Sequence, residues 1–267
     1  MGHIIAFANH KGGVAKTTTV TNTAFGLIKA KKRVLVIDCD PQGNASMTLG
    51  TVSPFEQQFT IENLFTDSNV NFSRCAVKSK YEGIDLIASN INASAMASAL
   101  GPSDAKRFIC LKNKYDEKAQ AKYDFILIDC PPTLEGAFLM NAMAVADFYV
   151  VPIEAESMYA LQGVDSLLTA VKVMTEYTNK ELKLLGAIVT MFDSRTTAGR
   201  VMVEGIRSYF GNTHVFQTII HRNTAVNKAN MLFKCVCDFD PKSSGCQDYR
   251  DLAKEIIARI ENWKDFA

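Results

Sequence analysis

The sequence has almost no net charge and no long apolar run, and both absences narrow what the chain can do. Its 29 lysine and arginine residues balance 28 acidic residues, which leaves a formal net charge of +1. The molecule as a whole is therefore no polycation, and a surface for nucleic acid would have to be a local patch. No apolar run approaches the roughly 18–20 residues of a membrane-spanning helix, and no cleavable signal peptide fits the N-terminus.

Repeats, low-complexity tracts and linkers rich in proline, glycine or serine are also missing. Because 48% of the 267 residues are hydrophobic, the chain can bury a substantial core, and we expect a single domain over residues 1–267. The seven cysteines are more typical of a reducing cytosol than of a disulfide framework. We therefore expect a cytoplasmic protein whose cysteines are reduced.

Apolar runs recur along the chain with helical patterns between them. Several of these runs are rich in valine, isoleucine and leucine without alternation, which is typical of strands buried on both faces of a parallel sheet. The order predicts an α/β fold with a doubly wound, mostly parallel sheet flanked by helices. The predicted strands span residues 4–8, 33–38, 84–88, 125–129, 148–152, 184–190 and 215–219. The predicted helices span residues 17–31, 94–99, 103–122, 139–144, 161–178, 198–209 and 247–262.

The segment between the first predicted strand and the first predicted helix has the composition of a phosphate-binding loop. Residues 9–18 read Asn-His-Lys-Gly-Gly-Val-Ala-Lys-Thr-Thr, and the backbone N–H groups of such a loop can hold phosphate oxygens at a helix N-terminus. Lys16 would reach the β- and γ-phosphates, and the Thr17 hydroxyl would bind Mg²⁺. The expected nucleotide-binding residues of the loop are Lys11, Gly12, Gly13, Val14, Ala15, Lys16, Thr17 and Thr18.

Two positions of this loop depart from the generic phosphate-loop pattern. His10 and Ala15 stand where that pattern has glycine, and alanine restricts the backbone more than glycine does. The loop also carries a second lysine, Lys11, although one lysine is enough to hold a phosphate. We assign no catalytic role to His10, and Lys11 needs an explanation of its own.

Carboxylates follow two of the predicted strands. Asp38 and Asp40 come at the end of the second strand, and Asp129 ends the fourth. Ligands of open α/β sheets bind at the carboxyl ends of the strands, so we expect these acids beside the phosphate loop. A strand-ending aspartate in such proteins holds Mg²⁺ directly or through water. The expected metal-binding residues are Thr17, Asp40 and Asp129.

Together these motifs resemble a known family. The sequences Lys-Gly-Gly-Val-Ala-Lys-Thr-Thr, Asp-Cys-Asp-Pro-Gln-Gly-Asn and Ile-Asp-Cys-Pro-Pro are similar to those of the deviant Walker ATPases of the ParA/Soj group, which are relatives of MinD. The resemblance covers nearly the whole chain, and its late segments favour ParA/Soj over MinD. These late segments are residues 190–196, 222–223 and 240–253.

The resemblance implies roles for individual residues. Lys11 is similar to a signature lysine that crosses a dimer interface to the partner's nucleotide, and Gly12 to a position where the subunits approach too closely for a side chain. Asp40 matches the carboxylate that orients the attacking water. The residues implied near the adenine are Met191, Arg222 and Asn223, with His221 where proline is usual. The implied catalytic residues are Lys11, Lys16 and Asp40.

The implied activity is ATP hydrolysis with Mg²⁺ in a DNA-partitioning protein. ATP-bound copies would form a sandwich homodimer that binds double-stranded DNA non-specifically on the nucleoid, and a ParB-type centromere-binding partner would stimulate hydrolysis. The phosphate loop starts so early that no helix-turn-helix domain is expected before it. Two alternatives stay open: a MinD-like membrane-associated spatial regulator, and a metabolic enzyme of the same superfamily, such as a carboxylate ligase or an iron–sulfur reductase.

A local concentration of positive charge lies late in the sequence. Between residues 194 and 235 the only acid is Glu204, and clustered lysine and arginine can bind a phosphate backbone without reading bases. Pairing with acids elsewhere in the fold is the alternative. The family binds DNA through this region, so the resemblance supports DNA binding. The expected DNA-binding residues are Arg195, Arg200, Arg207 and Arg222.

Two features near the C-terminus have alternative interpretations. The spacing of Cys235, Cys237 and Cys246 suggests a metal site only loosely, and a reduced structural set is favoured. Residues 249–263 have an amphipathic helical pattern with charges of both signs. This mixture favours packing on the domain over binding to a membrane.

Overall fold

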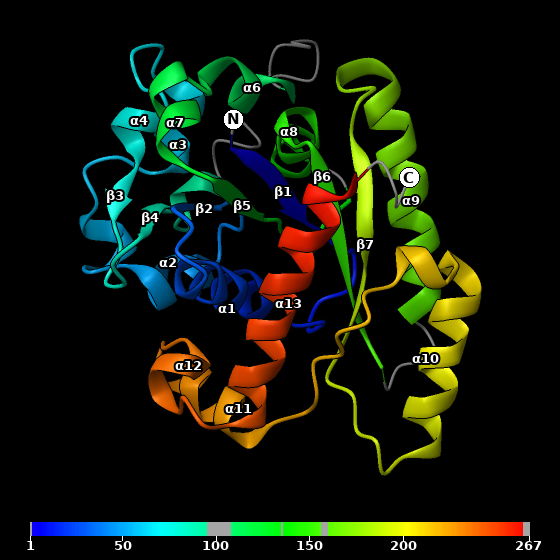
Figure 1. Cartoon of the computed structure of the whole chain (residues 1–267). Coiled ribbons are helices and arrows are strands. Elements are labelled where there is room, and N and C mark those ends of the chain that lie inside the picture. The colour runs from blue at the N-terminus through cyan, green and yellow to red at the C-terminus, as the bar shows by residue number, and fades with distance from the viewer. Residues whose placement is uncertain (1, 95–107, 135, 156–159, 264–267) are drawn as a thin grey trace.

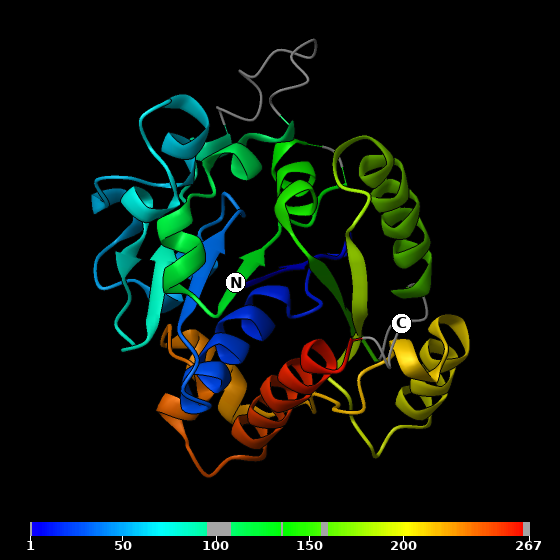
Figure 2. The same ribbon diagram turned by 45° about the horizontal axis from the view of Figure 1, so that its top comes forward.

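The computed structural model describes residues 2–94, 108–134, 136–155 and 160–263. These residues form a seven-stranded sheet with helices on both faces (Figure 1, Figure 2). The strands lie in the order β3-β4-β2-β5-β1-β6-β7, and in the described part of the chain β3 and β4 are the one antiparallel pair of neighbours. The strands are β1 (His3–Phe7), β2 (Val34–Asp38), β3 (Val77–Lys78), β4 (Ile84–Ile87), β5 (Phe125–Asp129), β6 (Phe148–Glu154) and β7 (Lys183–Thr190).

The central strands bury both faces, which gives the sheet two hydrophobic cores. In β1, Ile4 and Ala6 belong to one core, whereas Ile5 and Phe7 belong to the other, because successive side chains of a strand alternate. The first core is covered by α3 (Ile61–Thr66), α4 (Phe72–Cys75), α6 (Cys110–Lys114), α7 (Glu117–Lys122), α8 (Ala137–Val145), α9 (Ala160–Thr178) and α10 (Thr197–Phe210). The second is covered by α1 (Lys16–Lys29), α2 (Asn44–Leu49), α11 (Thr224–Met231), α12 (Val236–Phe239) and α13 (Ser244–Glu261).

The predicted mostly parallel α/β fold is confirmed, and six of the predicted strands correspond to β1, β2, β4, β5, β6 and β7. The strand predicted at 215–219 is wrong, since only Val215 forms a bridge there, to Ala187. The carboxylate of Glu255 on α13 instead accepts the backbone N–H groups of Gln217 and Thr218, each at 2.8 Å. A side chain thus takes the place of a neighbouring strand.

The prediction of one continuous helix over 103–122 is wrong. In the described residues from 108 onward it is divided into α6 and α7, because the Asp116 carboxylate caps α7 through the Ala119 N–H at 3.0 Å. The same carboxylate accepts the Ser73 N–H at 2.9 Å, which fixes the break against α4. The helix predicted over 94–99 lies outside the described residues apart from Ser94. Short 3₁₀ turns complete the fold at Pro54–Glu56 and Asn212–His214.

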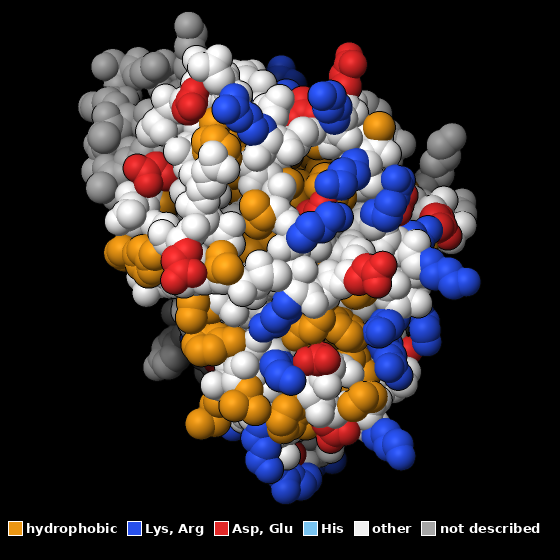
Figure 3. Space-filling model, turned by 90° about the vertical axis from the view of Figure 1, so that its left-hand side faces the viewer, with side chains coloured by type: hydrophobic (Ala, Val, Ile, Leu, Met, Phe, Trp, Pro, Cys, Tyr) orange, Lys and Arg blue, Asp and Glu red, His pale blue; other side chains and the backbone are white. Residues whose placement is uncertain are grey.

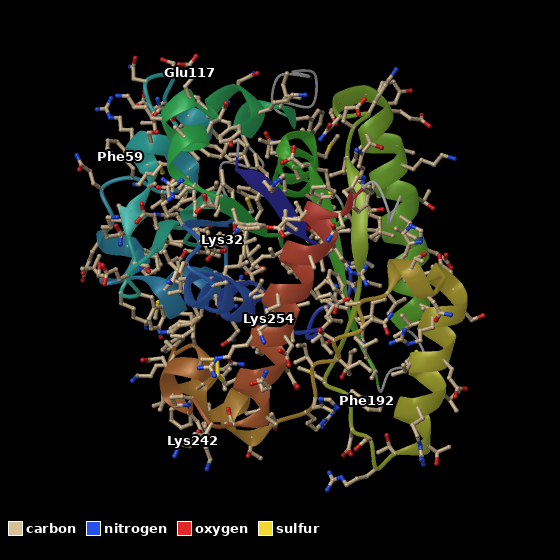
Figure 4. The ribbon with its side chains drawn as sticks, in the orientation of Figure 1. Lys32, Phe59, Glu117, Phe192, Lys242 and Lys254 are labelled. Carbon is tan, nitrogen blue, oxygen red and sulfur yellow. A yellow bond between two sulfur atoms is a disulfide. The ribbon has the colours of Figure 1, made fainter. Side chains whose placement is uncertain are left out.

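The expectation that the cysteines are reduced is wrong for one pair. Cys237 and Cys246 form a disulfide, with their Cα atoms 4.7 Å apart (Figure 4). The turn between α12 and α13 brings these residues together, and sequence spacing alone does not reveal that turn. Cys235 remains a buried thiol, and the described residues contain no group of side chains suited to hold a metal through three or more cysteine, histidine or acidic ligands.

Helix α13 packs on the domain, as its mixed charges predicted. Leu252 and Ile256 are fully buried, and Gly26 of α1 leaves so little space that a Cβ there would lie 2.8 Å from the Ala253 Cβ. Among the described residues, no helix is long and apolar enough to cross a bilayer. The face at the β3 edge, shown in Figure 3, mixes basic, acidic and hydrophobic side chains.

Candidate functional site

The loop between β1 and α1 is fastened to the carboxyl ends of two neighbouring strands. The Asn9 side chain donates to the Pro152 carbonyl of β6 at 2.6 Å and accepts the Lys11 N–H at 2.9 Å. On the other side, the Thr190 hydroxyl at the end of β7 donates to the Val14 carbonyl at 3.1 Å. The loop therefore has a fixed course before any ligand binds.

Two loop residues adopt left-handed backbone conformations. Gly13 has φ +80°, and Ala15, the N-cap residue of α1, has φ +61° and ψ +31°. The first turn of α1 receives no side-chain cap from Ala15, so this side chain does not compete with an anion for the N–H groups of that turn. A Cβ added to Gly12 or Gly13 would meet no described atom within 4 Å, which leaves this side of the loop open.

Lys16 lies inside the cradle formed by the loop. Its side chain is only 7% exposed, and its Nζ donates to the Lys11 carbonyl at 3.2 Å. Burial lowers the pKa of Lys16, while the nearby carboxylate of Asp129 opposes that shift. The structure therefore brings the predicted phosphate lysine and the predicted metal carboxylate together.

Asp129, the last residue of β5, is fully buried. Neither of its carboxylate oxygens has a hydrogen-bond partner among the described residues, although the Thr17 hydroxyl is close enough to lower its pKa. Burial is the larger effect and raises the pKa of Asp129 well above its usual value. A buried, unpaired carboxylate beside a threonine hydroxyl fits the oxygen ligands that Mg²⁺ prefers.

The two aspartates after β2 have different surroundings. Asp38 accepts the Ser46 N–H at 2.8 Å and the Ser46 hydroxyl at 2.7 Å, so it holds the start of α2 in place. Burial raises the pKa of Asp38 to about 7. Asp40 is 9% exposed and accepts only the Gln42 N–H among the bonds found in the described residues, at 2.9 Å. Asp40 thus keeps acceptor capacity toward the loop, whereas Asp38 is committed to structure.

A cavity of about 130 Å³ adjoins the loop on the β7 side. Its lining brings together the three residues predicted near the adenine, but the Asn223 side chain is already occupied. The Asn223 Oδ1 accepts the Ala225 N–H at 2.8 Å and so caps α11, while its Nδ2 donates to the Ser244 hydroxyl at 2.8 Å. The cavity is lined by Ala15, Thr18, Met191, Ile220, His221, Arg222, Asn223, Val226, Asn227, Asn230 and Tyr249.

Sequence reasoning missed several residues of this cavity, because α11 was not predicted. Asn227 and Asn230 lie on α11 and line the cavity, and Asn230 Nδ2 donates to the Thr18 hydroxyl at 3.1 Å. This bond ties α11 to the first turn of α1. The signal available in the sequence was an Asn-Thr pair at 223–224, which is a common helix start.

The predicted DNA-binding arginines lie in two parts of the structure, with Arg195 and Arg222 near Asp193 and the other two on α10. Arg195 is 86% exposed and pairs with Asp193, its Nη2 lying 2.6 Å from Oδ2, and Arg222 is close enough to help lower the pKa of Asp193 after the Arg195 bonds. Phe192, labelled in Figure 4, joins the two segments through the Arg222 N–H at 2.9 Å. Arg200 is exposed near the start of α10, while Arg207 is half-buried toward its end.

Known proteins support what this geometry indicates. Residues 2–184 match the family model described as an AAA domain. The chain is 37% identical to the sporulation initiation inhibitor protein Soj of Bacillus subtilis, over 97% of this chain and 99% of that protein. It is also 37% identical to the chromosome-partitioning ATPase Soj of Thermus thermophilus, over 96% of each.

Solved structures share the fold. A cobyrinic acid a,c-diamide synthase from Mycobacterium smegmatis, bound to an ATP analogue and magnesium, superposes with a TM-score of 0.83 at 30% identity over 98% of this chain and 97% of that one. The McdA(D38A)–ATP complex from Cyanothece gives a TM-score of 0.83 at 19% identity over 96% of each chain, and this likeness concerns the fold alone.

The parallel sheet, the anchored phosphate loop and the carboxylates at its strand ends define a phosphate-loop ATPase of the deviant Walker type. Within that class the near full-length similarity is more specific. The chain belongs to the ParA/Soj family of partitioning ATPases, in the MinD/ParA superfamily.

Proposed function

We propose that this protein is a DNA-partitioning ATPase that works as a nucleotide switch. ATP and Mg²⁺ bind at the loop, ATP-bound copies pair as a sandwich dimer, and the dimer binds double-stranded DNA without sequence preference. A ParB-type centromere-binding partner stimulates hydrolysis and returns the protein to the monomer. The observation that supports this most directly is the buried, unpaired Asp129 carboxylate beside Thr17 and Lys16.

The residues around the loop divide the work of phosphoryl transfer. Such a reaction needs positioning and charge neutralisation more than covalent help from the protein. Thr17 and Asp129 would hold Mg²⁺, which would supply positive charge to the phosphates, and Lys16 would reach the same phosphates from its buried position. Asp40, with acceptor capacity left over, accepts a hydrogen bond from the attacking water.

Lys11 of each protomer contacts the nucleotide bound to the other protomer of the dimer. The loop is open at Gly12 and Gly13, so a partner can approach, and the ammonium of Lys11 then neutralises charge on the partner's nucleotide. Replacing Lys11 with alanine is expected to leave ADP binding intact and to abolish the ATP-dependent dimer. Sizing chromatography with ATP tests this, and an unchanged dimer would refute the trans role of Lys11.

DNA binding is assigned to Arg195, Arg200, Arg207 and Arg222. Arg195 and Arg222 flank Asp193, and doubling such a patch in a dimer provides several phosphate contacts. Retardation of arbitrary duplex DNA should require ATP and weaken steeply with salt. The charge-removing change Arg200→Ala should weaken retardation, whereas Arg33→Ala, which removes a charge at the amino end of β2 where Arg33 pairs with Asp124, serves as the control. Equal retardation with ADP and ATP would contradict the proposal.

Two other functions can be separated from this one. A membrane-associated regulator would need an apolar surface, but the apolar face of α13 is buried. The similarity to a protein named as a diamide synthase makes an ATP-dependent amide-forming enzyme the second candidate. ADP release that depends on a carboxylate and an amine donor, and not on DNA, would favour that candidate.

A further inference from the structure

An ion pair inside the protomer holds the second lysine of the phosphate loop. The Lys11 Nζ lies 2.8 Å from Glu154 Oε2, with 31% of the lysine side chain and 22% of the glutamate side chain exposed. The two residues are 143 positions apart in the sequence. In this conformation the lysine already has an anionic partner, although the proposed function requires its ammonium at the nucleotide of another copy.

Only the side chain of Lys11 has freedom to change partners. Its backbone N–H is bonded to Asn9, which is itself fastened to Pro152, and its carbonyl accepts the buried Lys16 ammonium. A long lysine side chain on a fixed backbone can exchange one anion for another by rotation about its own bonds.

The glutamate is equally well fixed. Glu154 is the last residue of β6 and stands in register with Thr190 of β7, the residue whose hydroxyl fastens the loop at Val14. The carboxylate can therefore follow the lysine only as far as its own shorter side chain reaches. Pairing with Glu154 and pairing with a partner's triphosphate are mutually exclusive unless the phosphate comes to the glutamate, which like charges disfavour.

We propose that Glu154 is a positioning residue for Lys11: it retains the lysine ammonium within its own protomer until the triphosphate of a second copy displaces the carboxylate. This inference rests on the proposed trans role of Lys11. Glu154 thus sets how readily ATP-bound protomers pair, and it keeps ADP-bound protomers apart because ADP lacks the γ-phosphate charge that competes for the lysine.

The expected size of the effect follows from the exposure of the pair. A partly exposed lysine–carboxylate pair changes an equilibrium by up to about 5-fold. A dimer breaks two such pairs, so removing the glutamate charge should strengthen ATP-dependent dimerisation by up to about 25-fold. A ligand shifts such an equilibrium only through its differential affinity for the two states, and here the difference lies in the anion that Lys11 meets.

The test compares Glu154→Gln with the intact protein by sedimentation, in the presence of Mg²⁺ and an ATP analogue that is not hydrolysed. Glutamine keeps the shape of the side chain and removes its charge. The dimer dissociation constant should fall by roughly 2- to 25-fold, with no comparable change in ADP affinity. Asp251→Asn is the matched control, because it removes an equally sized charge from an exposed pair with Lys254 on α13 and should change neither quantity.

A double-mutant cycle assigns the effect to Lys11. In a Lys11→Ala background the Glu154→Gln substitution should have no effect on association. A tighter dimer in that background, or an equal gain in ADP affinity, would show a general effect of charge and overturn the inference. A weaker dimer in Glu154→Gln would show that the pair orients Lys11 for its partner, which also overturns it. If the intact protein forms no ATP-dependent dimer, the proposed function itself is refuted.

Discussion

Replacing Ala15 with glycine should make the protein more stable. Ala15 has φ +61° and ψ +31°, a left-handed conformation that costs a residue with a Cβ about 1–2 kcal/mol. Glycine removes this cost but loses about 0.5–1 kcal/mol more conformational entropy on folding. The methyl group of Ala15 is half-buried at the wall of the cavity of about 130 Å³, so its loss takes back a few tenths of the ~0.8 kcal/mol typical of a fully buried carbon.

The net gain is about 0.5 kcal/mol, which corresponds to a rise of about 1–2 °C in Tm for a chain of this length. Thermal unfolding followed by circular dichroism, without nucleotide, measures it. Lys31→Gly is the matched control, because Lys31 has φ +62° at an exposed position at the end of α1. Both variants should rise in Tm, and Ala15→Val should fall, since a branched side chain tolerates positive φ poorly.

A fall in Tm for Ala15→Gly beside a rise for Lys31→Gly would refute the reasoning. It would mean that the methyl group of Ala15 contributes more to packing than the left-handed backbone costs. Equal changes in both variants would confirm that backbone conformation dominates at Ala15.

Three further predictions concern buried charge and the disulfide. Asp129→Asn should raise the Tm of the metal-free protein, because it removes an unpaired buried carboxylate. The same substitution should abolish the additional rise in Tm that Mg²⁺ gives in the presence of nucleotide. If Mg²⁺ raises the Tm of the variant as much as that of the intact protein, Asp129 is not a ligand. Burial raises the pKa of Asp38 in the folded protein to about 7 from an unfolded value of about 4, so the folded state binds the proton more tightly. The free energy of unfolding of the metal-free protein should therefore decrease as the pH rises from about 4 to about 7. This decrease should be smaller in Asp38→Asn. Reducing the bond between Cys237 and Cys246, or replacing both with serine, should cost about 2–3 kcal/mol of unfolding free energy, and denaturation in urea with and without dithiothreitol checks this.

The sequence predicted the central strands and missed the parts of the fold that depend on distant contacts. Runs of valine, isoleucine and leucine are sufficient for strands buried on both faces. The run at 215–219 is less apolar, and two of its N–H groups donate to the Glu255 carboxylate on a helix far along the chain instead of to a strand. In the same way, Asp116 divides a helix by capping one half and bonding to Ser73.

The phosphate site was predictable because its residues are neighbours in sequence or end apolar strands. Asp129 was found by that second signal, yet Glu154 ends β6 in the same manner and was overlooked. Its importance becomes visible only when the fold brings it to Lys11. The opposite holds for Asn223, which sequence similarity placed near the adenine and whose side chain is committed to capping α11.

The hydrogen bond between Thr190 and Val14 couples the phosphate loop to the segment that follows β7. Thr190 ends β7, and the backbone that follows leads in five residues to Arg195. The phosphate loop is thus tied directly to the stretch of chain that carries Arg195, one of the arginines proposed to contact DNA. We expect a displacement of the loop on nucleotide binding to reorient Arg195 within a single protomer, so that ATP alters the affinity for DNA of each subunit before two subunits meet.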